Sequence, residues 1–70
     1  MNRIQVNKLV LSKWTAVTPR KKEKHFLVTQ FVDDDSDPRH VILEAVHSKR
    51  EYVIVWTELK DDAIWRQGWR

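Results

Sequence analysis

One stretch of the chain decides the fold class: Val41-Ile42-Leu43-Glu44-Ala45-Val46-His47-Ser48-Lys49-Arg50-Glu51-Tyr52-Val53-Ile54-Val55-Trp56. Two runs rich in β-branched, aromatic and leucine residues flank a polar centre, which favours two antiparallel strands over residues 41–47 and 52–59. If Ser48 pairs with Glu51, Ala45 faces Ile54 across the hairpin. No Asn-Gly or Asp-Gly dipeptide marks a two-residue turn, so this register stays open.

Both faces of this hairpin are partly apolar. A sheet with one wet face would show a cleaner alternation of apolar and polar residues. We therefore expect a sheet that curls on itself or is covered by other elements.

Two more apolar runs precede the hairpin, at residues 8–17 and 25–32, and both are typical of strands. The first ends at Thr18-Pro19, because proline fixes its own φ and forces the preceding residue into an extended conformation. Residues 20–24 are basic and are expected to form a solvated loop. Residues 33–38, four aspartates with Ser36 and Pro38, are dense in turn-forming residues and predict an exposed loop.

The last ten residues predict a short helix. Asp61 is a candidate N-cap, Asp62 favours the positive end of a helix dipole, and Gly68 is a candidate C-terminal stop. Trp65 and Trp69 would then share one face of a continued helix, or Trp69 would fold back if Gly68 ends it.

Together these elements predict a mainly β fold: a four-stranded antiparallel meander or partly open small barrel with a short C-terminal helix. The 70 residues are expected to form a single domain, 1–70, with residues 1–7 as a candidate flexible N-terminus. No run reaches the roughly 20 apolar residues of a membrane helix, and the first residues lack a signal-peptide pattern. We expect a cytoplasmic protein that does not bind a membrane.

Four tryptophans and no cysteine stand in this short chain. A domain of this size buries only about 60% of its unfolded surface, and large aromatic rings or self-association can compensate. We expect Trp14 and Trp56 in the core and Trp65 docking the closing helix onto it. Trp69, next to Arg70 and near Arg66, is the best candidate for exposure, with packing and binding roles both open.

Seven segments of the chain carry a resemblance to a known family: 11–19, 23–28, 43–46, 49–52, Trp56, 58–61 and 65–69. Over residues 8–69 the chain resembles a family of small tryptophan-rich bacterial proteins of unknown function. The resemblance implies a bacterial, cytoplasmic protein and assigns no activity, substrate or cofactor.

Charge is locally polarised along the chain. Residues 13–24 hold five basic residues and one acidic residue, whereas residues 33–37 hold four aspartates. Clustered lysines and arginines next to an aromatic ring suit the phosphate backbone of a nucleic acid. The candidate binding surface therefore consists of Lys13, Arg20, Lys21, Lys22, Lys24, Arg66 and Trp69.

No catalytic or metal motif emerges. His25, His40 and His47 lack the short matched spacings of zinc ligands, and the aspartate run lacks the distal Glu of an EF-hand loop. The single glycine excludes a Gly-rich phosphate loop. We expect no enzyme activity and no cofactor, and a binding module for a protein partner or for self-association. The alternative is a nucleic-acid accessory protein that uses residues 20–24 and an exposed Trp.

Overall fold

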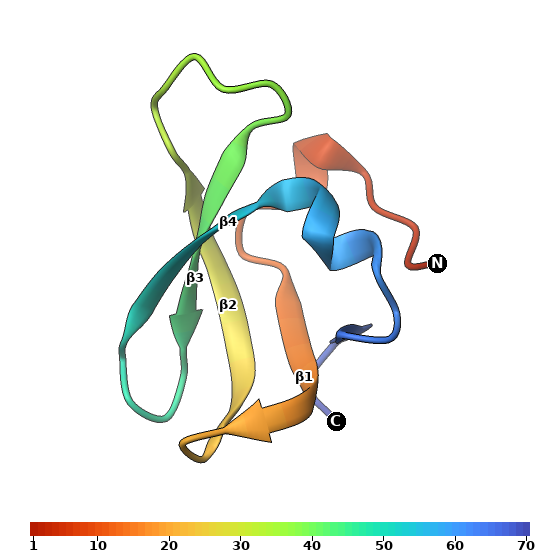
Figure 1. The fold of residues 1–70 in the computed structure, drawn as a ribbon, viewed down its shortest axis with the longest axis vertical. Helices are drawn as coiled ribbons and strands as arrows, with labels where there is room; N and C mark the ends of the chain where they lie inside the picture. The colour runs from red at the N-terminus through yellow and green to blue at the C-terminus, as the bar shows by residue number, and fades with distance from the viewer.

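The computed structural model describes all 70 residues, and it shows one antiparallel sheet with two short 3-10 turns (Figure 1). The elements follow in the order η1 (Val6–Lys8), β1 (Lys13–Arg20), β2 (Glu23–Phe31), β3 (His40–Ala45), β4 (Glu51–Val55), η2 (Trp56–Lys60) and β5 (Trp65–Gln67). The strand order across the sheet is β4-β3-β2-β1-β5. The mainly β prediction is confirmed, and the sheet is open, with β4 and β5 at its two edges.

The predicted C-terminal helix is wrong, and the strand count is five instead of four. Asp61 begins only a single turn: its Oδ1 accepts the Ala63 amide at 2.9 Å and its carbonyl accepts the Ile64 and Trp65 amides, but the chain then becomes extended at β5. Residues 65–67 then pair with the free edge of β1, Thr15 opposite Arg66 and Ala16 opposite Trp65. That edge satisfies the backbone groups that a helix would otherwise have to satisfy internally.

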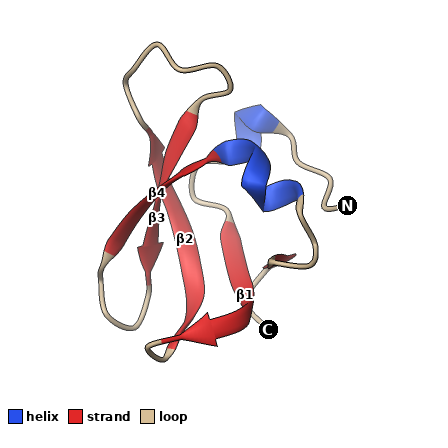
Figure 2. Ribbon diagram, viewed as in Figure 1, coloured by secondary structure: helices blue, strands red, loops and turns tan.

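Helical structure lies instead in two other places, one of them a segment expected to be a strand and the other mostly in the candidate flexible N-terminus. The run 52–59 leaves the sheet after Val55 and continues as the 3-10 turn η2, which buries Leu59. The other 3-10 turn, η1, precedes β1 (Figure 2). Both turns are too short to cover the whole inner face of the sheet, which leaves part of it open.

The basic segment 20–24 is not a loop. Arg20 pairs with Glu23, so only Lys21 and Lys22 form the turn between β1 and β2. Both lysines have positive φ, 55° and 63°, the combination that a type I′ hairpin turn requires. Lys24 belongs to β2. The aspartates, by contrast, lie between β2 and β3 in the loop that the sequence predicts.

The structure settles the register of the β3–β4 hairpin that the sequence left open, and it differs by four residues from the pairing of Ser48 with Glu51. Glu44, not Ser48, pairs with Glu51, and Leu43 pairs with Tyr52. A longer connection closes the hairpin, with the Ala45 amide donating to the Arg50 carbonyl at 2.8 Å. Residues 46–50 turn outside the ladder, and Lys49 takes a positive φ of 67°.

The core lies between the inner face of the sheet and the segments that contain η1 and η2. Trp14 and Trp65 are 2% and 8% exposed, and Trp56 is half-buried against the core. The core consists of Leu9, Trp14, Phe26, Val28, Val41, Leu43, Ala45, Leu59 and Trp65.

The N-terminal residues 1–4 contact the segment around η2. Asn2 Nδ2 donates to the carbonyls of Leu59 and Trp65, at 2.9 and 2.8 Å, and the Asn2 amide donates to Lys60. The N-terminal amine lies 2.6 Å from Asp62. These are the contacts that the candidate flexible segment 1–7 makes at its beginning.

Candidate functional site

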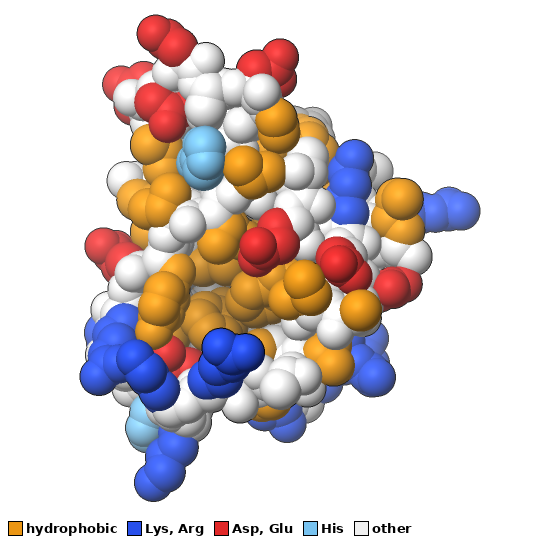
Figure 3. All heavy atoms as spheres, viewed as in Figure 1, with side chains coloured by type: hydrophobic (Ala, Val, Ile, Leu, Met, Phe, Trp, Pro, Cys, Tyr) orange, Lys and Arg blue, Asp and Glu red, His pale blue; other side chains and the backbone are white.

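An apolar groove occupies the part of the inner sheet face that η1 and η2 leave open. Its volume is about 660 Å³. Figure 3 shows this hollow, with apolar side chains on its floor, basic side chains at its lower end and acidic ones above it. The lining comes from all five strands and the segment before β5: Ala16, Thr18, Arg20, Lys21, Glu23, Phe26, Leu43, Tyr52, Ile54, Ala63, Ile64 and Trp65.

A bend in β1 shapes the groove. The register between β1 and β2 shifts between Thr15 and Arg20, so the intervening residues do not pair with β2. The Val17 amide instead donates to the Ile64 carbonyl at 2.9 Å. Such bulges bend a strand and re-aim its side chains. β1 thereby reaches both β2 and the segment before β5, which forms the wall opposite β4.

The floor of the groove is a set of aromatic rings in fixed contact. Phe26 meets Trp65 edge to face, with centroids 5.1 Å apart, and meets Tyr52 at 6.1 Å in a similar geometry. Trp65 Nε1 donates to Glu58 Oε2 at 3.1 Å, which fixes the orientation of the indole. Edge-to-face pairs of this kind are favourable beyond their buried area, so the floor is preformed.

A buried carboxylate lies at the basic end of the groove. Glu23 is 5% exposed and accepts hydrogen bonds from Ser48 Oγ and from Tyr52 Oη. These bonds, from Ser48 first and Tyr52 second, hold the pKa of Glu23 below its ordinary value, so the carboxylate is ionised. The same bond to Glu23 raises the pKa of Tyr52, which stays a neutral donor.

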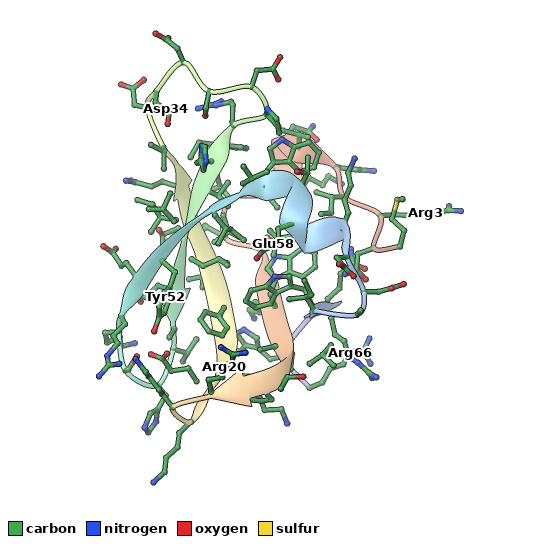
Figure 4. All side chains as sticks on the ribbon, in the orientation of Figure 1. Arg3, Arg20, Asp34, Tyr52, Glu58 and Arg66 are labelled. Atoms are coloured by element: carbon green, nitrogen blue, oxygen red, sulfur yellow. The ribbon has the colours of Figure 1, made fainter.

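The charges at this end have no partners at ion-pair distance. The two ion pairs of the structure join Met1 to Asp62 and His40 to Asp34. Arg20 and Lys21 line the groove without a carboxylate within 4.0 Å. Figure 4 shows Arg20 below the groove, Tyr52 at its side and Glu58 above it. The groove therefore has an apolar floor and a cationic end.

Every buried side-chain N or O atom of the protein has a hydrogen-bond partner. The Glu23–Ser48–Tyr52 cluster is thus complete within the chain, and it ties the β1–β2 turn to the β3–β4 connection. What the groove offers to another molecule is apolar contact and the two cations.

A second surface lies on the outer face of the sheet around Trp69, which is 43% exposed. Lys13 Nζ lies 4.7 Å from the Trp69 ring centroid, and the His25 ring lies 6.0 Å away. Trp69 Nε1 donates to the Phe26 carbonyl at 3.0 Å, which anchors the ring. Thr15 pairs with both His25 and Arg66, so these two side chains share its face of the sheet.

The structure divides the residues expected from the sequence to form one surface. Lys13, Arg66 and Trp69 lie on the outer face, whereas Arg20 and Lys21 line the groove. Lys22 and Lys24 are exposed, at the hairpin tip and at the start of β2. Glu23 and the groove floor are not among the residues expected from the sequence. The only signal in the sequence is that Glu23 is the single acidic residue among the basic residues 20–24, and such a pattern does not indicate burial.

No group of three or more His, Cys, Asp or Glu side chains is arranged to hold a metal ion. The structure also contains no helix with the length and apolar character needed to cross a bilayer.

These features define a class: a small, tryptophan-rich domain built on an open five-stranded antiparallel sheet with an apolar groove. The family described as Tryptophan-rich protein (DUF2389) matches residues 12–70, and the chain belongs to this family. The resemblance seen in the sequence is confirmed, and the family has no assigned function. Neither the curated proteins nor the solved structures contain a match to this chain.

Proposed function

We propose that this protein is a non-enzymatic binding module of the bacterial cytoplasm, and that its groove takes a short segment of another protein. The proposal rests on one observation: the apolar floor of the groove is preformed, and no other part of this short chain covers it. Phe26 and Trp65 are buried core residues that also line the groove, while Ile64 beside them is 44% exposed. Burying one large apolar side chain of a partner here contributes about 1.5–3 kcal/mol.

The charges of the groove select the partner. Arg20 and Lys21 are free of ion pairs, and Glu23 is already satisfied by Ser48 and Tyr52. A segment with two or three large apolar residues followed by acidic residues would fill the floor and place carboxylates beside the two cations. A segment ending in lysines would place like charges together at that end.

Two peptides of matched apolar sequence test this proposal, one ending in Asp-Asp and the other in Lys-Lys. Binding is followed by the NMR shift of the Trp65 indole N–H, because the Trp65 ring is part of the groove floor. The acidic peptide should bind, and the basic one should bind at least several-fold more weakly. Ile64→Arg should abolish the shift, because a charged side chain would occupy the open groove. Leu11→Arg, at an exposed aliphatic residue outside the groove, is the control; Leu11 is 67% exposed and Ile64 is 44% exposed.

The proposal fails if neither peptide shifts the Trp65 signal at millimolar concentration. It also fails if Ile64→Arg binds like the Leu11→Arg control, because the site would then lie elsewhere.

A second candidate function, binding of single-stranded nucleic acid, is favoured by the surface around Trp69. An exposed indole flanked by Lys13, Arg66 and Arg70 can stack a base and pair with phosphates. Two glutamates on the same outer face oppose this role: Glu44, which pairs with Leu27, and Glu51, which pairs with Glu44. Titration with a single-stranded oligonucleotide at two salt concentrations tests it: binding should quench Trp69, weaken with salt and disappear in Trp69→Ala.

A further inference from the structure

The outer edge of β4 is an unprotected strand edge. β4 lies at one end of the sheet order and pairs only with β3. The Trp56 amide donates to Arg39, and the Ala45 amide donates to Arg50, which places residues 50 and 56 in hydrogen-bonded positions toward β3. Because these positions alternate along an antiparallel strand, the backbone groups of Glu51, Val53 and Val55 point away from β3.

Nothing in the chain covers this edge. No hydrogen bond outside the sheet ladder involves the backbone of Glu51, Val53 or Val55. The Val53 side chain is 60% exposed. Natural sheets protect their edges with lysine, proline, bulges or very short strands, and residues 51–55 contain none of the first three. The other edge strand, β5, has only three residues, whereas β4 has five.

The two ends of β4 differ in net charge: at one end four basic residues outnumber Glu23, Glu44 and Glu51, and at the other the four aspartates of residues 33–37 outnumber Arg39. Lys49 and Arg50 precede the strand, and Ser48 bonds to Glu23, which brings the Lys21–Lys22 turn to the same end. At the other end His40 pairs with Val55, directly after the aspartate loop 33–37. Figure 3 shows the acidic group at the top and a basic group at the lower left of the molecule.

We propose that two copies of this chain associate by antiparallel pairing of their β4 edges about a two-fold axis at Val53. Glu51 of each copy would face Val55 of the other, and the three facing positions would form about six backbone hydrogen bonds. The two Val53 side chains would pack against each other on the outer face. The result is one continuous sheet across both copies (Figure 1 shows β4 at its free edge).

Charge selects this arrangement and this occupant. Antiparallel pairing brings the basic end of one copy toward the acidic end of the other, whereas parallel pairing would bring like charges together. The attraction acts between the basic residues of one copy and the aspartates of the other, which are not in direct contact. It is therefore a long-range effect that salt weakens. The edge uses backbone groups of Glu51, Val53 and Val55, while the groove uses side chains of Tyr52 and Ile54. The dimer and the groove therefore use different groups, and a failed test of one leaves the other unaffected.

Sedimentation equilibrium over a concentration series into the millimolar range tests the proposal, together with amide hydrogen exchange. We expect the mass of a dimer at the upper concentrations and concentration-dependent protection of the amides of residues 51, 53 and 55. Val53→Lys should give a monomer with an unchanged circular dichroism spectrum, because residue 53 faces solvent in a single copy. Val10→Lys, at an exposed valine in the loop before β1, should still dimerise.

Three outcomes overturn the proposal. One is a wild-type monomer throughout the series. The second is a dimer that Val53→Lys leaves intact or whose three amides exchange freely. The third is protection of these amides only after a foreign peptide is added, which would assign the edge to another occupant.

Discussion

The Lys21–Lys22 turn holds two side chains in a backbone conformation that disfavours them. Its φ values of 55° and 63° lie in the left-handed region. For a residue with a Cβ this region costs about 1–2 kcal/mol, whereas asparagine tolerates it better and glycine adopts it freely. Asn-Gly is the preferred pair for a type I′ turn. The double variant Lys21→Asn, Lys22→Gly should therefore be more stable than the wild type.

The expected gain in the free energy of unfolding combines two effects, the relief of backbone strain in the folded turn and the greater freedom of the unfolded chain. Relief at both positions contributes about 2 kcal/mol, and the greater freedom of glycine in the unfolded chain removes about 0.5–1 kcal/mol. The net increase in the free energy of unfolding is about 1 kcal/mol, and for a domain of this size it raises Tm by about 4–8 °C. The same variant should bind the acidic peptide more weakly, because it removes Lys21 from the groove.

Urea unfolding followed by tryptophan fluorescence measures the gain, with an unchanged m-value as evidence that the surface exposed on unfolding is the same. Two single variants serve as controls. Lys24→Gly, in β2, should lose about 0.5–1 kcal/mol, because glycine weakens a strand. Lys22→Ala removes a charge but keeps a Cβ at positive φ, so it should stay within about 0.5 kcal/mol of the wild type. Equal stabilisation by Lys22→Ala would refute the argument, since charge repulsion would then explain the gain.

Three further predictions concern the buried carboxylate, the tryptophans and the N-terminus. The lowered pKa of Glu23 contributes stability that is present above its ordinary pKa of 4.5 and is lost as the pH falls through the folded-state value. Urea unfolding of Glu23→Gln should therefore show a shallower loss in acid than the wild type, and parallel curves would contradict this. Among single-tryptophan variants, acrylamide should quench Trp69 most and Trp14 least, because they are 43% and 2% exposed; the reverse order would exclude this packing. Asn2→Ala leaves the Leu59 and Trp65 carbonyls without a donor and should cost about 1–3 kcal/mol. If the N-terminus were flexible, Asn2→Ala would leave the free energy of unfolding unchanged. The variant therefore distinguishes an anchored N-terminus from a flexible one.

Several features could be predicted from local sequence alone. The runs around residues 26–31 and 41–45 are β-branched and aromatic, and both are strands. The aspartates exclude regular structure between them, because short polar side chains favour turns. The burial of Trp14 and Trp65 and the exposure of Trp69 also follow the prediction. In these segments residue type, local conformation and burial all favour the same structure.

The C-terminal strand could not be predicted in this way. Asp61 and Gly68 are compatible with a helix and with a turn, and three residues are too few for a periodic pattern. Gly68 does adopt a positive φ of 81°, but it ends a strand and donates its amide to Lys13. The available edge of β1, between 49 and 53 residues away in the chain, makes this segment extended.

The sequence by itself thus determined that this is a small β protein with tryptophans in its core and opposite charges in two separate turns. Only the tertiary structure decided the register of β3 and β4, the burial of Glu23 and the existence of the groove. The physical reason is that each of these depends on hydrogen bonds and contacts between distant segments. The groove is the clearest case, because it is the space that five strands enclose and two short 3-10 turns do not fill.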